Sequence, residues 1–205
     1  EFHFPLSLQF EVTSKCNLRC KHCYNRSGEN KNADAMTGDN WIEFAKKLVG
    51  KGGILEATIS GGEPLLMGDK LFELMDVLHD DGTVFNLISN GYLFDKKILS
   101  RLKKYRFYWI QISLDSYSSK LHDEFRGVKG SWERAARAAY LIALSGIPLR
   151  KQFFVAICTS QTAICVNAVS GSSVEYCCQQ ADGNRYKQKY DQPMPKIRLR
   201  QLPRT

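Results

Sequence analysis

The sequence predicts an α/β fold built on a parallel sheet. Short runs rich in β-forming residues alternate with amphipathic stretches through residues 1–156. The stretches between successive runs are long enough for right-handed crossovers, which place consecutive strands side by side and parallel. Small or polar residues follow four of the runs: the cysteine-rich segment 16–23, "SGGEP", "SNG" and "SLD". Because ligands of parallel sheets gather at the carboxyl ends of the strands, we expect the functional site at that edge.

The first two strand–helix units precede residue 81. "LSLQFEV" (6–12) is expected to be a strand that ends at the cysteines. "WIEFAKKLVGKG" (41–52) has apolar residues at helical spacing and ends in glycine, which predicts a helix. "LEATISGGEP" (55–64) predicts a strand that closes on a glycine pair, and "LFELMDVLHD" (71–80) predicts a second helix.

The remaining units follow the same pattern. "TVFNLISNG" (83–91) and "FYWIQISLD" (107–115) predict strands, with a short basic helix at 95–105 between them. "SWERAARAAYLIALSG" (131–146) predicts a helix with Ser131 as its N-cap and Gly146 just past its end. "PLRKQFFVAI" (148–157) predicts a fifth strand.

Composition limits the classes of function. The 205 residues suffice for one domain with a real core, or for one and a fraction, and 43% hydrophobic with 24% charged residues is ordinary for a globular protein. No run of 18 apolar residues predicts a membrane span, and the start lacks the features of a signal peptide, so we expect a cytoplasmic protein. The start also lacks an initiator methionine, so we expect an upstream segment to be missing. The net charge of +8 comes without an aromatic and basic platform, so nucleic-acid binding is not predicted.

The sequence changes character beyond residue 157. Residues 158–205 show no helical stripe and little strand alternation, and their last part is rich in glutamine, proline and arginine. We therefore expect two parts, a core at 1–157 and an irregular basic tail at 158–205. Two explanations of the tail remain open: a foreign segment from a frameshift or a mis-joined gene, and a divergent auxiliary metal site. Its cysteines are Cys158, Cys165, Cys177 and Cys178.

Cys16, Cys20 and Cys23 form the pattern C-x3-C-x2-C. A structural zinc site needs four ligands, His22 adjoins Cys23 too closely to share one ion with it, and no second cysteine pair follows at the usual distance. A disulfide would leave one thiol over, and a cytosolic protein seldom forms one. An iron–sulfur cubane with three protein ligands fits better, because it leaves one iron free for a small molecule.

The cysteine pattern after a first strand, followed by "SGGEP", "SNG" and "SLD" at successive strand ends, resembles the radical S-adenosylmethionine (SAM) superfamily over about residues 6–157. The resemblance implies a partial (β/α)6 barrel, like a TIM barrel, whose last unit is missing or degenerate. It also implies a 4Fe–4S cluster and SAM as cofactors. In that family an electron from the cluster cleaves SAM to give a 5′-deoxyadenosyl radical, which abstracts hydrogen from a substrate.

The resemblance also assigns site residues. It makes Cys16, Cys20 and Cys23 the cluster ligands and places His22 beside the adenine, the alternative being a simple spacer. The other positions that it places around SAM are Gly61, Gly62, Glu63, Ser89, Asn90, Ser113 and Arg126. For the two serines and Asn90, capping of strand ends is the alternative, and for Arg126 it is a solvated surface arginine. Asp115 is expected to be a turn or cap residue, His3, His79 and His122 to be surface or cap residues, and Tyr24, Trp41, Trp109 and Trp132 to be packing residues.

The segments "SKCNLRCKHCY", "SGGEPLL" and "HDEFRGVKGSWERA" resemble the branch of the family that modifies peptides or proteins. This implies a peptide or protein substrate and an electron donor such as flavodoxin or ferredoxin, with no nucleic-acid or membrane partner. Without a final barrel unit we expect an exposed sheet edge, an apolar lumen and weak or absent turnover. Two alternatives remain: a non-catalytic iron–sulfur or zinc-binding module, and an inactive gene fragment that binds no cofactor.

Overall fold

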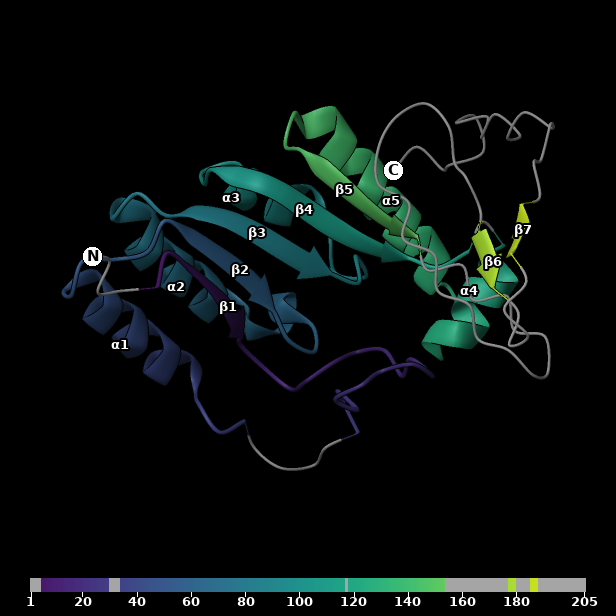
Figure 1. Ribbon diagram of the computed structural model, residues 1–205, viewed down its shortest axis with the longest axis horizontal. Coiled ribbons are helices and arrows are strands. Elements are labelled where there is room, and N and C mark those ends of the chain that lie inside the picture. Colours follow the sequence, from purple (N-terminus) through teal and green to yellow (C-terminus); the bar gives the residue numbers. More distant parts are fainter. Residues whose placement is uncertain (1–4, 30–33, 117, 154–176, 180–184, 188–205) are drawn as a thin grey trace.

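The computed structural model shows a five-stranded parallel sheet (Figure 1). It describes residues 5–29, 34–116, 118–153, 177–179 and 185–187, with side chains described as far as residue 150. The strands lie in chain order, and each pairs in parallel with the next. This confirms the predicted α/β fold. The strands are β1 (Ser7–Glu11), β2 (Glu56–Ser60), β3 (Val84–Ser89), β4 (Phe107–Leu114) and β5 (Leu149–Phe153).

The four predicted helices are confirmed, with shifted ends. They are α1 (Gly38–Val49), α2 (Asp69–Asp80), α3 (Lys96–Leu102) and α5 (Ser131–Ser145). The short 3-10 helix η1 (Pro64–Met67) and the helix α4 (Ser119–Arg126) were not predicted. Helix α4 was missed because it has few apolar residues to reveal a periodicity. Its N-cap is Ser118, whose side chain accepts a hydrogen bond from the Leu121 amide, and its C-cap is Gly127 in the left-handed conformation.

The cap of α5 differs from the prediction. Ser131 is the first residue of the helix, and Gly130 is its N-cap. The Asp123 side chain supplies the capping acceptor from α4. It accepts hydrogen bonds from the amides of Gly130 (2.6 Å) and Trp132 (2.8 Å) and from the Ser131 hydroxyl (2.8 Å). The prediction of Ser131 as N-cap was therefore wrong, because a carboxylate distant in sequence satisfies the free amides of the first turn.

The main core lies between the helices and one face of the sheet. It joins apolar side chains of β1 to β4 with those of α1, α2, α3 and α5. Along each strand these core residues alternate with residues that face the other way, as in Phe85 and Leu87 of β3. Burying each such side chain is worth about 1.5 to 3 kcal/mol, so this face fixes the register of the strands.

The opposite face of the sheet is mixed: it carries polar residues of β1 to β3 together with the apolar Ile88 and Trp109. Gln9 donates a hydrogen bond to the Ser60 hydroxyl (3.0 Å), and Asn86 donates to the Thr58 hydroxyl (3.1 Å) and to Glu56. In a closed barrel this face would line the lumen. For the described strands the expectation of an apolar lumen is therefore correct only in part, because polar pairs between neighbouring strands occupy this face beside Ile88 and Trp109.

Much of the predicted tail lies outside the described residues, including Cys158 and Cys165. Within it, β6 (Cys177–Gln179) and β7 (Arg185–Lys187) form an antiparallel pair, which the sequence did not predict. The two explanations of the tail stay predictions. In the described part of the chain no helix has the length and apolar character needed to cross a membrane.

Candidate functional site

The candidate site is built around the loop that follows β1 and carries Cys16, Cys20 and Cys23, called the cysteine loop below. Cys16, Cys20 and Cys23 are free and partly buried. Nitrogen donors approach their sulfur atoms: the Leu18 amide lies 3.4 Å from Cys16 Sγ, and the Ser27 amide lies 3.2 Å from Cys23 Sγ. Hydrogen bonds to sulfur stabilise negative charge on it, as cluster-ligating thiolates require.

As free thiols, Cys16 and Cys20 are not activated nucleophiles. Burial raises the pKa of Cys16 and of Cys20 above the ordinary value for a thiol. Both are therefore protonated near neutral pH when no metal is present, which does not favour a thiol-exchange role. A bound metal ion would remove these protons, because the thiolate is the form that binds.

The three thiols suit a cluster better than a single ion. Among the residues that the structure describes, no three histidine, cysteine, aspartate or glutamate side chains are grouped closely enough to bind one metal ion. The corners of a cubane are separate iron atoms, so its ligands stand farther apart than those of one zinc ion. Three free thiols with nitrogen donors beside their sulfur atoms are a donor set that fits an iron–sulfur cluster with one open iron.

Gly61 and Gly62 lie against the cysteine loop. The Gly62 amide donates to the Thr13 carbonyl (2.6 Å), and the Glu63 amide donates to the Lys15 carbonyl (2.8 Å). A Cβ atom on Gly61 would clash with the backbone of Thr13, and one on Gly62 would clash with that of Lys15. Gly61 also has a φ of +131°, which disfavours other residues. Glycine was expected at these positions so that the backbone could approach a ligand closely. In the structure, the backbone of both glycines instead lies close to the backbone of the cysteine loop.

Glu63 is fully buried and links this turn to the end of β3. Its carboxylate accepts hydrogen bonds from the Leu65 amide (3.2 Å), the Ser89 hydroxyl (2.9 Å) and the Asn90 amide (2.8 Å). Burial raises its pKa to about 7, while these hydrogen bonds act in the opposite direction. The contacts support the expectation that Glu63 holds the loop, and they give Ser89 and Asn90 the strand-end capping role.

Asn90 also connects β3 to the cysteine loop. Its side-chain amide donates to Asn17 Oδ1 (2.9 Å) and lies 3.8 Å from Cys16 Sγ. The side-chain nitrogen of Asn17 is buried and has no hydrogen-bond partner among the described residues. A buried donor without a partner beside Cys16 is consistent with a site that accepts a ligand there.

Arg126 is buried behind the cysteine loop. Its guanidinium makes a two-pronged ion pair with Asp115, in which Nη2 lies 2.8 Å from Oδ1 and Nε contacts Oδ2. The remaining nitrogen, Nη1, lies 3.4 Å from Cys20 Sγ. The alternative of a solvated surface arginine was therefore wrong, because only 7% of the surface of Arg126 is exposed to solvent. Asp115 was expected in a turn or cap, but it is the buried counter-ion.

His122 is also buried, so its prediction as a surface or cap residue was wrong. Its Nδ1 accepts a hydrogen bond from the Asp115 amide (3.2 Å). Burial lowers the pKa of His122, and the ring is therefore neutral at neutral pH. Sequence spacing could not reveal the contact between His122 and Asp115, since this contact depends on α4 folding back onto the end of β4.

Other predicted residues are less closely tied to the loop. The His22 ring stacks on Phe125 with centroids 4.4 Å apart, and partial burial lowers its pKa. Ser113 is the last residue but one of β4 and is half-buried. Tyr24 is 82% exposed and donates to Glu11 Oε1 (2.8 Å), so its prediction as a packing residue was wrong.

Asp34 anchors the beginning of the cysteine loop, and the sequence argument did not identify it. Its carboxylate accepts hydrogen bonds from the Thr13 hydroxyl (2.7 Å) and from both the amide (2.7 Å) and the hydroxyl (2.5 Å) of Ser14. An isolated aspartate in a loop carries no recognisable pattern. Its role follows only from the return of the chain to the end of β1.

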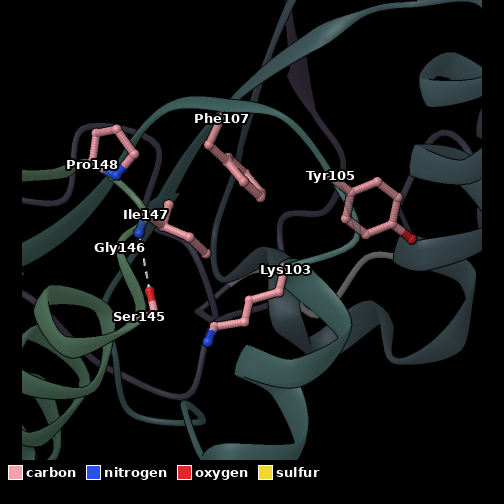
Figure 2. A pocket seen from close by; sticks show the side chains of 7 residues that line it. All are labelled: Lys103, Tyr105, Phe107, Ser145, Gly146, Ile147 and Pro148. Atoms are coloured by element: carbon pink, nitrogen blue, oxygen red, sulfur yellow. Dashed lines mark hydrogen bonds between the residues drawn. The ribbon is translucent and has the colours of Figure 1, made fainter.

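A separate cavity of about 390 Å³ lies at the opposite edge of the sheet (Figure 2). Phe107 begins β4 and Pro148 precedes β5, so the cavity is at the amino ends of these strands. It is therefore not part of the candidate site. Its lining consists of Lys103, Tyr105, Phe107, Ser145, Gly146, Ile147 and Pro148.

Comparison with known proteins identifies the family. The family model described as "Radical SAM superfamily" matches residues 10–159. The chain belongs to the radical SAM superfamily. Members of this family use SAM together with a 4Fe–4S cluster. The matched range takes in the cysteine loop and every predicted site residue.

Relatives of this radical SAM chain include proteins named for peptide maturation. It is 36% identical over 154 residues to the antilisterial bacteriocin subtilosin biosynthesis protein AlbA of Bacillus subtilis, covering 73% of this chain and 33% of that protein. It is 34% identical to the PqqA peptide cyclase of Gluconobacter oxydans, covering 74% of this chain and 42% of that protein. The chain thus spans about a third to two fifths of the length of these relatives.

A solved structure supports the fold. The SAM-bound structure of SuiB from Streptococcus suis has a TM-score of 0.63 and 23% identity, over 76% of this chain and 35% of that one. This likeness confirms the partial barrel, with parallel strands in chain order.

Proposed function

We propose that this chain is the core of a radical SAM enzyme that modifies a peptide or protein. The observation that carries the proposal is the presence of three free thiols in one loop, each beside a nitrogen donor, at the carboxyl edge of a radical SAM sheet. The names of AlbA and the PqqA peptide cyclase support a peptide substrate. We infer a small redox protein such as flavodoxin or ferredoxin as the electron donor.

In this proposal Cys16, Cys20 and Cys23 hold the cluster. When bound, the cluster supplies the electron that cleaves SAM and so provides a radical able to abstract hydrogen from the substrate. The positions proposed to lie around SAM are His22, Gly61, Gly62, Glu63, Ser89, Asn90, Ser113 and Arg126. Of these, the buried Glu63 and Arg126 would act by holding the loops in place. Within this set Glu63 holds the turn against the ends of β2 and β3, while the two glycines let the backbone of the turn approach the cysteine loop.

Anaerobic reconstitution with ferrous iron and sulfide tests the cluster. We expect about four iron and four sulfide per chain, with broad visible absorption. Alanine in place of Cys16, Cys20 or Cys23 should abolish the colour, whereas Cys165→Ala should retain it. One zinc per chain would instead support the zinc-binding module. A protein that stays colourless and binds no metal would contradict the proposal.

Activity is tested by incubating the reconstituted chain with SAM and dithionite. We expect 5′-deoxyadenosine to form in the wild-type protein and to be absent in each variant at Cys16, Cys20 and Cys23. A reconstituted wild-type cluster that releases no 5′-deoxyadenosine would refute the assignment of this chain as a working core.

A further inference from the structure

In the buried ion pair of Asp115 and Arg126, the arginine is the partner that faces Cys20. Asp115 lies just after β4 and Arg126 ends α4, and they are 2% and 7% exposed. Asp115 occupies Nε and Nη2 of the guanidinium, so Nη1 is the nitrogen that approaches Cys20 Sγ, at 3.4 Å. The positive group therefore stands between the carboxylate and the thiol.

No other described group offsets the Asp115 charge so closely. His122 is in contact with Asp115, but its Nδ1 accepts a hydrogen bond from the Asp115 amide and the ring is neutral. The charged environment of Cys20 thus consists chiefly of a near cation and a more distant anion. A cluster ligated by Cys20 would feel both charges with little screening, because the pair is shielded from solvent.

The backbone fixes this arrangement. The Arg19 amide donates to the Arg126 carbonyl (3.0 Å), and the Lys21 amide donates to the Phe125 carbonyl (2.9 Å). The cysteine loop thereby satisfies carbonyl groups that the end of α4 leaves free. Gly127, at φ +72°, lies so close to Arg19 that a Cβ atom would clash with its carbonyl. The end of α4 and the cysteine loop therefore form one rigid unit.

We propose that Asp115 and Arg126 are positioning residues that set the reduction potential of an iron–sulfur cluster through Cys20. This inference rests on the function proposed above. Reduction adds negative charge to a cluster, so a nearby cation favours the reduced form and a nearby anion opposes it. Arg126 raises the potential and Asp115 partly cancels that effect. Hydrogen bonds and charge near the sulfur atoms are known means of tuning such clusters.

The test is the reduction potential of the reconstituted full chain and four variants, measured by anaerobic spectroscopic titration. Arg126→Gln should lower the potential and Asp115→Asn should raise it. Each change should alter the equilibrium constant for reduction at least about tenfold, which is about 59 mV for one electron. The double variant carries neither charge but keeps two amides of similar size, so its potential should lie between those of the single variants. Arg126→Lys should stay closer to the wild type than Arg126→Gln.

Lys21→Gln is the matched control. Lys21 belongs to the same loop but is exposed and paired with the exposed Glu124, so loss of its charge should shift the potential far less. Circular dichroism establishes whether each variant is folded. If Arg126→Gln takes up no cluster, the upward shift expected for Asp115→Asn decides, together with a potential of the double variant below that of Asp115→Asn.

The results separate this inference from the proposed function. Opposite shifts for the two single variants support it, because damage to the fold would not depend on the sign of the lost charge. Shifts of the two single variants in the same direction would overturn it and leave the proposed function intact. The same holds if neither variant shifts the potential while the wild-type protein holds its cluster. A wild-type protein that takes up no iron and sulfide would overturn both.

Discussion

Replacing Glu63 with glutamine should change how the stability of the protein depends on pH. Burial raises the pKa of Glu63 from 4.5 to about 7, and no salt bridge of the described residues neutralises it. Below about pH 4.5 the carboxyl is protonated in both the folded and the unfolded chain. Above that pH the unfolded chain loses the proton first, so the folded state loses stability until the pH passes about 7. Since one pKa unit is worth about 1.4 kcal/mol, the full loss is about 3 kcal/mol.

The assay is urea unfolding of the metal-free protein and of Glu63→Gln between about pH 5 and about pH 8. The difference in unfolding free energy between them isolates Glu63, because the other titrating groups are common to both. Relative to Glu63→Gln, the wild type should lose about 2 to 3 kcal/mol across this range. A difference that is constant with pH, or that grows in favour of the wild type as the pH rises, would show that Glu63 is ionised in the folded state.

Three further substitutions test the supports of the site and the core by urea unfolding. Gly62→Ala should cost about 1 to 3 kcal/mol, because its Cβ atom would meet the Lys15 carbonyl. Asp34→Ala should cost about 1 to 3 kcal/mol and weaken iron retention, because the Ser14 amide and hydroxyl lose a charged acceptor. Thr83→Val should cost about 1 to 3 kcal/mol, because the buried Thr83 hydroxyl donates to a backbone carbonyl (2.9 Å) that would lose its partner.

Matched substitutions serve as controls. Gly50 has a φ of −62°, and a Cβ atom there would meet the Lys46 carbonyl at an ordinary contact distance of 3.4 Å, so Gly50→Ala should change stability by less than about 0.5 kcal/mol. Asp39 is an exposed partner of Lys70, so Asp39→Ala should have a similarly small effect. If Gly62→Ala or Asp34→Ala proved as harmless as its control, the contacts described for the cysteine loop would not support it.

The fold could be predicted because its signals are local. Each predicted strand is a short run rich in β-forming residues, four of these runs end in small or polar residues, and each predicted helix shows a periodic apolar face. The predicted start of α1, at Trp41, lies after the true start at Gly38, because the cap of this helix lies outside the apolar pattern. Thr37 and Asn40 form a reciprocal capping pair upstream of the first apolar residue.

The environment of the cysteines could be predicted only in part. Their spacing indicated a metal cluster, but the ion pair behind Cys20 joins residues from β4 and α4 that look like a turn aspartate and a surface arginine. Charged residues are rarely buried, so a single sequence favours exposure unless the partner is known. Helix α4 was itself missed, and with it the reason for Asp115, His122 and Arg126 to be buried.

The contact between Arg126 and Cys20 spans 106 residues of sequence. On a ribosome that adds about 5 to 20 residues per second, the thiols would emerge about 5 to 20 seconds before the guanidinium that covers one of them. During that interval the nascent segment has no cation at its second cysteine and no helix end to shape it. Insertion of a metal cluster is therefore expected to follow synthesis of α4, and premature oxidation of the thiols is the hazard that this delay creates.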